Sequence, residues 1–586
     1  MNTRFFLRIT SSLLLSVFII SCLHINDDNE DEEESKPDET TVDTTTGNAE
    51  PHEDPADYVW DSSSENIITL HGSSITVSGS GASANGSVLT ITAAGNYNIS
   101  GSLTNGQIIV NTEETEIVRL IFNGIDVSCS NSAPVNIKKA GKVIIILPEN
   151  TNNYLADGTS YTFDSSSDDE PNAALFSKSA LSIYGNGSLT VNGNYNDGIT
   201  GKDGLIITAG TISVTANDDG IRGKDYLIIK SGTFNLTTGG DGLKSDNETN
   251  AAKGYISVES ATVTITSGTD AMQAVTDILI ASGTFNLKSG GGSSSSISSL
   301  ISAKGLKAEI SIIIDYGDFI INSADDGLHS GGSLVINNGN ITISSRDDGI
   351  HADGAIVING GNIEITKSYE GIEGPSITVN SGNLSIASSD DGFNATSGRG
   401  GESNDGSYLN LYGGNIVVNA SGGDGIDSNG NMRMTAGTVL VHGPSGSVEV
   451  GMDVNGNIDV TGGTLIISGT GSNMTEAPNT STSQYSVLIF FTSSRAAGTL
   501  FHLQDTNGNE IVTFQPIRSY SSMVVSSPAL TKGTSYQIYT GGTHTGTVED
   551  GLYSGGTYSG GILYGSFTIS ATLTKVGSSS GGTGGR

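Results

Sequence analysis

Lysine and arginine are scarce in this chain of 586 residues: 26 basic residues stand against 62 aspartates and glutamates, and the formal net charge is −36. A chain this acidic repels nucleic-acid phosphates, which argues against nucleic acid as a partner. Docking on an anionic membrane surface through a basic patch is disfavoured for the same reason. The excess of carboxylates instead favours metal cations, or anionic polymers bridged by cations, as partners.

Cysteine and tryptophan are almost missing. Two cysteines, Cys22 and Cys129, cannot form the disulfide framework of a secreted scaffold, and Cys129 lies in an alternating apolar run that predicts core packing. The single tryptophan, Trp60, argues against a flat aromatic platform of the kind that binds cellulose. Few histidines and no cysteine cluster argue against zinc. We also find no long segment of helical period and no Ser-His-Asp order.

The N-terminal segment 1–22 has the pattern of an export signal. Arg4 and Arg8 precede an apolar run over residues 9–20, which is too short for an ordinary membrane span. The segment Ile19-Ile20-Ser21-Cys22 resembles a bacterial lipobox, which implies cleavage before Cys22 and lipidation of its thiol. The alternative is an ordinary signal peptide that contains a cysteine. We therefore expect an exported protein that is lipid-anchored to the bacterial cell envelope and exposed at its surface.

Changes in composition divide the chain into six segments. In order these are the signal peptide over 1–22, an acidic disordered tether over 23–60, N-terminal β-helix coils with a loop over 61–175, regular parallel β-helix over 176–470, a C-terminal β region over 484–575 and a disordered tail over 576–586. Insertions rich in Gly, Ser and Asn predict loops at one corner of the repeat, at 150–172, 246–254, 290–304, 397–407 and 469–483.

A short sequence repeat dominates the middle of the chain. Asp-Gly followed by a bulky apolar residue begins at Asp197, Asp219 and Asp241, then at Asp326, Asp348 and, with glutamate, Glu370, and later at Asp391 and Asp424. Each period holds three apolar pulses, as required for three short strands with alternate residues inward. We therefore predict an all-β fold, a three-sided parallel β-helix (β-solenoid) with about 22 residues per coil and a C-terminal β cap. The motifs of leucine-rich repeats and of calcium-binding nonapeptide rolls are missing.

Residues one period apart should stack, because neighbouring coils lie about 4.8 Å apart. We expect two columns of acids, one from residue 197 to 241 and one from 326 to 391. Two carboxylates at this distance repel by roughly 3.5 kcal/mol at an effective dielectric constant of 20, and several bound Ca²⁺ ions would relieve the repulsion. The alternative is turn chemistry, in which aspartate caps backbone N–H groups at a bend. The predicted calcium ligands are Asp197, Asp218, Asp219, Asp241, Asp246, Asp326, Asp348, Asp353, Glu370, Glu373, Asp391, Asp424 and Asp427.

Four basic residues lie beside the first column, on what we expect to be its outward face. Arg222 and Lys244 share one stacked position, and Lys202 and Lys224 share another. These four are candidate ligand-binding residues, because Arg and Lys grip the carboxylates of acidic sugars. Local salt bridges to the aspartate column are the alternative. His329 and His351 stack beside the second column, and we expect solvated face residues there rather than metal ligands.

Six segments carry a family resemblance: NDGI at 196–199, DDGIRGKD at 218–225, GDGLKSD at 240–246, SYEGIEG at 368–374, GNYNISG at 95–101 and LIFNGI at 120–125. They resemble the bacterial carbohydrate-binding β-helix family with a polysaccharide-lyase-like fold, over roughly residues 65–570. The resemblance implies a right-handed parallel β-helix with several calcium ions. It also implies non-catalytic binding of acidic plant-type polysaccharides such as polygalacturonate, or of cellulose.

We therefore predict a calcium-dependent, carbohydrate-binding surface lipoprotein that recognises acidic polysaccharide or a cellulose-like glycan. Its membrane contact would be the N-terminal lipid only, and no nucleic acid or protein partner is expected. The first alternative is a calcium-dependent polysaccharide lyase of the pectate type, with Lys202, Arg222, Lys224 or Lys244 as the base that takes a proton from a uronate. The second alternative is a structural adhesin.

Overall fold

The computed structural model describes residues 48, 52–163, 165, 167–398, 403–446, 448–480 and 482–579. The helical segments among them are two short 3-10 turns, η1 (Pro55–Tyr58) and η2 (Ser62–Ser64). None of the helices found in these ranges is long and apolar enough to cross a membrane. The predicted signal peptide with Cys22, most of the predicted tether and most of the predicted tail lie outside the described residues. The all-β class is confirmed.

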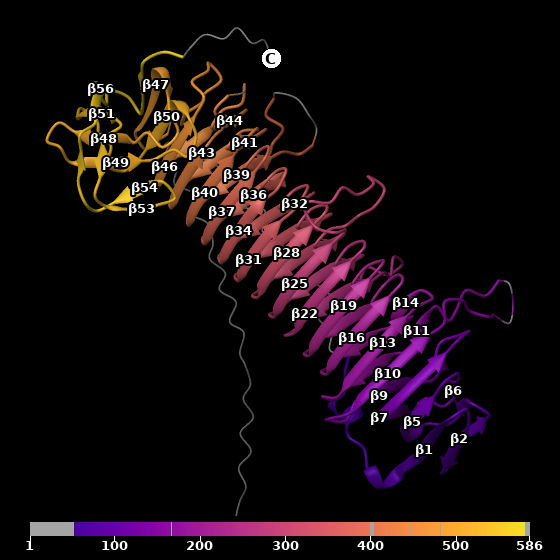
Figure 1. The fold of residues 1–586 in the computed structure, drawn as a ribbon. Coiled ribbons are helices and arrows are strands. Elements are labelled where there is room, and N and C mark those ends of the chain that lie inside the picture. The colour runs from indigo at the N-terminus through magenta and orange to yellow at the C-terminus, as the bar shows by residue number, and fades with distance from the viewer. Residues whose placement is uncertain are drawn as a thin grey trace, which may run out of the picture. The chain divides into compact units, whose positions relative to one another are not determined.

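Most strands belong to two long sheets, one of 33 strands and one of 16. A typical repeat gives one short strand, β14 (Asp197–Gly201), to the 16-stranded sheet and two strands, β15 (Leu205–Ile207) and β16 (Thr211–Ala216), to the 33-stranded sheet. Each strand pairs in parallel with the strand three elements later, so that β14 pairs with β17 (Ile221–Gly223). Figure 1 shows these strands side by side in chain order. One period of the sequence repeat therefore corresponds to one step from a strand to its parallel neighbour in each of the two sheets.

The 16-stranded sheet carries most of the candidate site residues. It consists of β3 (Ala82–Asn85), β4 (Val88–Ile91), β6 (Gln107–Asn111), β8 (Val135–Lys139), β11 (Ala173–Ser177), β14, β17, β20 (Leu243–Ser245), β23 (Met272–Ala274), β26 (Leu306–Ala308), β29 (Leu328–Ser330), β32 (Ile350–Ala352), β35 (Ile372–Gly374), β38 (Phe393–Ala395), β41 (Ile426–Ser428) and β44 (Met452–Val454).

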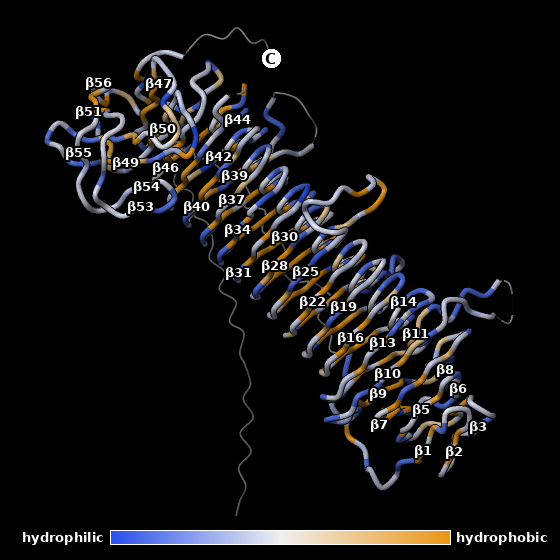
Figure 2. Tube along the Cα trace, in the orientation of Figure 1, coloured by the Kyte–Doolittle hydropathy of each residue, from blue (hydrophilic) through white to orange (hydrophobic). Residues whose placement is uncertain are grey.

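Alternation of buried and exposed residues along many of the strands builds one continuous core between the sheets. In β19 (Thr233–Thr238) exposed and buried residues alternate strictly, and Figure 2 shows the apolar positions recurring from strand to strand. Ile199, Ile221 and Leu243 occupy the same register position in successive repeats and are fully buried. Burying each such side chain contributes about 1.5–3 kcal/mol, so the stack is stabilised repeat by repeat.

Most residues of the predicted insertions lie between strands. Residues 246–254, 290–304 and 397–407 connect a strand of the 16-stranded sheet with a strand of a neighbouring face or repeat. Residues 150–172, expected to be a loop, include strand β10 (Asn152–Asp157). This strand pairs in parallel with β7 (Ile117–Cys129) and β13 (Ser188–Gly193), and its alternating burial shows that it is part of the core wall. Cys129 is buried, as predicted.

The C-terminal region ends the parallel stack with antiparallel strands. β46 (Thr464–Gly469) pairs with β50 (Tyr520–Ser526), which pairs in turn with β47 (Ser486–Arg495). A separate six-stranded antiparallel sheet has the order β53 (Thr547–Glu549), β54 (Leu552–Ser554), β49 (Glu510–Phe514), β48 (Phe501–Asp505), β51 (Ser535–Thr540) and β56 (Ile562–Thr568). Its Phe501 and Phe514 share a second core cluster with residues of β46, β47 and β50. Pairing of the last parallel strand leaves fewer unpaired backbone groups at the end of the sheet.

Residues 52–60, which we assigned to the disordered tether, pack against the folded body instead. The ring of Tyr58 stacks on that of Tyr184 with centroids 4.7 Å apart, and the ring of His52 stacks on that of Tyr226 at 4.0 Å. Asp57 forms an ion pair with Lys142. Composition indicated a polar linker, but these few aromatic and charged side chains find partners on the outer face of the 33-stranded sheet.

Candidate functional site

The repeated acids form one column, which we call the acid ladder. Each of its residues precedes the small residue that leads into a strand of the 16-stranded sheet, and backbone hydrogen bonds at that small residue join successive repeats. The ladder runs through Asp197, Asp219, Asp241, Asp270, Lys304, Asp326, Asp348, Glu370, Asp391 and Asp424. The prediction of two separate columns is wrong. Asp270 and Lys304 continue the ladder across insertions that break the regular spacing, which is why the sequence pattern missed them.

Ladder carboxylates cap the backbone of the next repeat. Oδ1 of Asp219 accepts a hydrogen bond from the backbone N–H of Asp241 over 2.9 Å, and Oδ1 of Asp241 accepts one from the N–H of Asp270 over 3.0 Å. A Cβ at Gly220 would lie 2.6 Å from the carbonyl oxygen of Gly242, which explains why glycine follows the aspartate there. Turn chemistry, the alternative to calcium binding, is therefore present at these positions, and it leaves the second carboxylate oxygen for other partners.

The ladder acids are buried, although we expected them on an outward face. Asp197 is 0% exposed, Asp219 is 3% exposed and Asp241 is 6% exposed. Burial and then the charge of Asp219 raise the pKa of Asp197 to about 7, and burial raises the pKa of Asp219 to about 6. The turn draws these side chains inward because their oxygens must reach the backbone of the neighbouring repeat.

A second column, which we call the outer ladder, lies three residues after each ladder position. Strand pairing places its members in register, on the outward face of the 16-stranded sheet. It runs through Thr200, Arg222, Lys244, Gln273, Lys307, His329, His351, Glu373, Asn394, Asp427 and Asp453. Its charge changes along the sheet, from basic to histidine to acidic.

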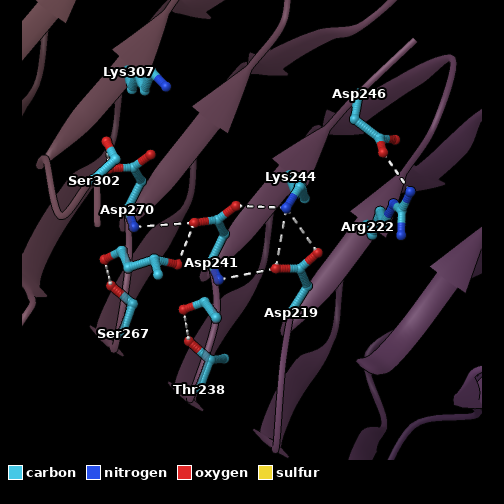
Figure 3. A network of polar contacts seen from close by, with 12 residues as sticks. Asp219, Arg222, Thr238, Asp241, Lys244, Asp246, Ser267, Asp270, Ser302 and Lys307 are labelled. Carbon is cyan, nitrogen blue, oxygen red and sulfur yellow. Dashed lines mark hydrogen bonds and ion pairs between the residues drawn. The ribbon is translucent and has the colours of Figure 1, made fainter. Parts of the chain in front are cut away.

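The basic part of the outer ladder neutralises the acid ladder. Nζ of Lys244 lies 2.8 Å from Asp241 and 3.1 Å from Asp219 (Figure 3). Arg222 forms an ion pair with Asp246 and approaches Asp197 at 3.7 Å. Burial lowers the pKa of Lys244, but the charges of Asp241 and Asp219 outweigh it and raise that pKa above its ordinary value. The local salt bridges that the sequence left open as an alternative are thus formed.

The other two candidate ligand-binding lysines differ from each other. Nζ of Lys202 lies 2.8 Å from Glu170, which also pairs with Lys178 at 2.9 Å. Lys224 is half-buried and forms no ion pair within the described part of the chain. Of the four predicted basic residues, three are therefore engaged by acids of this protein.

In the middle of the ladder, histidines replace lysine and arginine. Nδ1 of His329 lies 2.8 Å from Oδ2 of Asp326, which also accepts from Lys304 at 2.8 Å. Burial raises the pKa of Asp326, but the hydrogen bond with His329 and the charge of Lys304 lower it to about 2. Nδ1 of His351 lies 3.1 Å from Asp348. The expectation of solvated histidines is wrong, because both rings are half-buried and direct Nδ1 at a ladder acid.

The C-terminal part of the ladder offers only oxygen. Oδ1 of Asp391 accepts from the backbone N–H of Asp424 over 2.6 Å, and no lysine, arginine or histidine in the described ranges pairs with either carboxylate. Burial raises the pKa of Asp391 to about 7 and that of Asp424 to about 8, and acidic neighbours add to the effect. Burial and the charge of Glu373 raise the pKa of Glu370 to about 9. This donor set fits Ca²⁺, which binds oxygen ligands and would relieve the unfavourable charge.

Some of the remaining predicted calcium ligands lie close to other carboxylates, and others do not. One carboxylate oxygen each of Asp197, Asp218 and Asp219 lie within 4.8 Å of one another, as do those of Asp325, Asp326 and Asp347, two of which were not predicted. Asp246 is engaged by Arg222, and the side chain of Asp353 is 67% exposed. The structure thus brings the ladder acids and their direct chain neighbours together. Asp246 and Asp353 belong to neither group of three carboxylates, and Oδ1 of Asp353 lies 3.4 Å from Nε2 of His351.

A groove on the other sheet is a second candidate site. It encloses about 430 Å³ between the outward side chains of β31 (Asn340–Ser344), β34 (Asn362–Lys367), β37 (Asn383–Ser388), β40 (Asn415–Ala420) and β43 (Thr438–His442) and the C-terminal strands β53 (Thr547–Glu549) and β54 (Leu552–Ser554). One edge is a ladder of asparagine amides, in which each Nδ2 donates to the Oδ1 of the preceding repeat over 2.8–3.2 Å. Its acidic residues are Glu364, Glu549 and Asp550, and no basic residue in the described part of the chain lines it.

Comparisons with known proteins agree with the predicted family. A family model described as "Carbohydrate-binding domain-containing protein" matches residues 85–349 and 348–573. A relative of the same description from Acetivibrio thermocellus is 40% identical over 126 residues, 22% of this chain, and the match spans only 44% of the relative. A solved structure described as a polysaccharide lyase-like protein from C. thermocellum, gadolinium derivative, shares 31% identity. It covers 44% of this chain and 100% of that chain, with a TM-score of 0.41. The matched residues span most of the sequence, and this chain belongs to the family of carbohydrate-binding domain-containing proteins.

Proposed function

We propose that this protein is a non-catalytic, calcium-dependent binder of polysaccharide, built on a right-handed parallel β-helix and displayed on the bacterial surface. The observation that carries the proposal is the oxygen-only end of the acid ladder in a protein of a carbohydrate-binding family. Asp391 and Asp424 are buried carboxylates next to further acids, and an ion there would lower an electrostatic cost, since no basic residue in the described ranges forms an ion pair with either carboxylate.

Calcium at this end would also supply the contact with an acidic glycan. Ca²⁺ accepts six to eight oxygens, so a site with few protein carboxylates retains coordination positions for uronate oxygens. Asp427, in the outer ladder beside Asp424, is half-buried and faces outward on the same sheet. Polygalacturonate, which repels an acidic protein, would then be held through shared cations.

The test is retention of the full chain on immobilised polygalacturonate in calcium and in EDTA. We expect retention in calcium only, and loss of retention in the double variant Asp391→Asn, Asp424→Asn. Asp353→Asn is the matched control, because it makes the same chemical change at an exposed carboxyl. Retention that is equal in calcium and EDTA would contradict the calcium role, and failure to bind any glycan would favour the structural adhesin.

The ion pairs of three of the four basic residues favour binding over lyase chemistry. A general base must release its proton near working pH, but acidic partners raise the pKa of Lys244 and of Arg222. Lys202 is also paired with an acid. We therefore expect no unsaturated product, measured as ultraviolet absorbance, when the protein is incubated with pectate and calcium. Accumulation of that product would instead support the lyase.

The groove favours a second candidate, binding of a neutral, cellulose-like chain. Amide and carboxylate side chains form hydrogen bonds with sugar hydroxyls, whereas the absence of basic residues from the lining disfavours uronates. Val417 and Leu552 add apolar surface against which the C–H faces of sugar rings can pack. This binding would be independent of calcium, which separates it from the first candidate.

Surface display depends on lipidation at Cys22, which lies outside the described residues. We propose that the mature protein begins at Cys22 and is anchored by its lipid. Phase partition of the expressed protein in a detergent that separates on warming tests this. The wild type should enter the detergent phase, and Cys22→Ser should remain in the aqueous phase.

A further inference from the structure

Two consecutive outer-ladder positions are histidines, and Nδ1 of each lies near a ladder acid. β29 and β32 pair in parallel so that His329 lies beside His351, with ring centroids 4.9 Å apart and ring planes inclined by 31°. Nδ1 of His329 lies 2.8 Å from Asp326, and Nδ1 of His351 lies 3.1 Å from Asp348. The Asp-Gly-x-His segment thus occurs in two successive repeats, and in both Nδ1 of the histidine lies close to Oδ2 of the aspartate.

Glu373 occupies the next position and converges on the same nitrogen. Its Oε2 lies 3.2 Å from Nδ1 of His351, because β32 and β35 pair with His351 opposite Glu373. The ligand atoms of Asp348, His351 and Glu373 all lie within 4.8 Å of one another. In the part of the chain that the structure describes, no lysine or arginine forms an ion pair with Asp348 or Glu373.

The donor chemistry here differs from that of the C-terminal end of the ladder. Calcium prefers oxygen ligands, whereas imidazole nitrogen with carboxylates suits first-row transition metals and zinc. An ion that takes the place of the His351 Nδ1 proton would be bound by one nitrogen and two carboxylate oxygens. The side chains are only partly exposed, so they are already held in place by the sheet.

We propose that Asp348, His351 and Glu373 form a binding site for a divalent transition-metal ion such as Zn²⁺. Oδ2 of Asp348, Nδ1 of His351 and Oε2 of Glu373 are the ligand atoms. His329 belongs to an overlapping group, in which it, Asp326 and His351 have ligand atoms within 4.8 Å of one another. The ligands of this site do not include Asp391 or Asp424, and the proposal does not depend on glycan binding.

The test uses the full chain after removal of metals with a chelator. Titration with Zn²⁺ is followed by calorimetry, Co²⁺ is followed by its visible absorption, and Ca²⁺ serves as the comparison. We expect wild type to bind Zn²⁺, and His351→Gln and Glu373→Gln each to weaken binding at least tenfold, the scale on which loss of a site partner acts. His71→Gln is the matched control, at an exposed histidine of β1 (Glu65–Gly72), and should leave the affinity unchanged.

Two outcomes would overturn the proposal. In the first, wild type takes up no Zn²⁺ and shows no Co²⁺ band, which would make the cluster an ion-pair network only. In the second, both variants retain wild-type zinc affinity, which would place the ion elsewhere. Thermal unfolding curves check that each variant is folded, and Glu373→Gln keeps the shape of the side chain if His351→Gln proves unstable.

Discussion

Oδ1 of Asp219 accepts a hydrogen bond from the backbone N–H of Asp241, one repeat later in the chain, over 2.9 Å. Oδ2 of Asp219 also forms an ion pair with Nζ of Lys244 over 3.1 Å. One carboxylate therefore joins two neighbouring repeats through the backbone and anchors a basic side chain of the outer ladder. Because Asp219 makes both contacts, we expect loss of its carboxylate or of the Lys244 ammonium to destabilise the ladder.

Removal of the Asp219 carboxylate should destabilise the protein. Asp219→Ala leaves the buried N–H of Asp241 without its acceptor, which costs about 1–3 kcal/mol. Asp219→Asn keeps an acceptor oxygen and should cost less. The midpoint of thermal unfolding measures both, with Asp353→Ala as the exposed control, and equal effects of the three changes would contradict the role of the hydrogen bond.

Removal of the Lys244 ammonium should be more damaging. Lys244→Met leaves Asp219 and Asp241 buried with their shared cation gone, and breaking such a buried pair costs about 3–5 kcal/mol. The loss should shrink at lower pH, because burial raises the pKa of Asp219 to about 6 and its protonation removes part of the uncompensated charge. Unfolding midpoints at pH 8 and pH 6 test this. Lys288→Met, at an exposed lysine, is the control and should change little at either pH.

Stability at the C-terminal end of the ladder should fall as pH rises when calcium is absent. The folded pKa values of Asp391 and Asp424, about 7 and about 8, lie above the ordinary value of about 3.9. The folded state therefore holds these protons more tightly. The stabilisation of the folded state by these protons is complete below about pH 3.9, the ordinary pKa of aspartate. It is lost as the pH rises from there through the folded pKa values of Asp391 and Asp424.

Unfolding midpoints in EDTA from pH 5 to pH 9 measure this effect. Asp424→Asn should lose less stability than wild type over that range, because its amide does not ionise. Calcium should raise the wild-type midpoint more at pH 8 than at pH 5, and the double variant Asp391→Asn, Asp424→Asn should not respond. Parallel pH profiles of wild type and Asp424→Asn would rule out the predicted titration.

Filling the groove should block a neutral glycan without affecting calcium. Ser385→Trp, on the exposed face of β37, would occupy the space between the sheet and β54 and should reduce binding of soluble cello-oligosaccharides at least tenfold. Thr264→Trp places the same ring at the equivalent position of β22 (Thr262–Ser267), outside the groove. Equal binding by the two variants, measured by calorimetry, would exclude the groove as the site.

The sequence predicted the parts of this protein that repeat. Asp-Gly at a regular spacing predicted the register of the parallel strands, because a side chain that serves a turn in one repeat serves the same turn in the next. Alternation of apolar residues predicted the core, including Ile199 and Ile221, because a strand has two faces. The carbohydrate-binding family was also visible in these segments.

Only the tertiary structure decided which charges meet. Asp270 and Lys304 lie in the ladder although insertions displace them in sequence, because the sheet keeps its register while the loops absorb extra residues. The approach of His351 Nδ1 to Glu373 and the groove beside β54 likewise depend on neighbours distant in sequence. The sequence by itself determined a periodic all-β chain with stacked acids, since periodicity is local. Packing between repeats decided which carboxylates are buried and which basic residue each of them pairs with. That packing cannot be read from the sequence of one repeat.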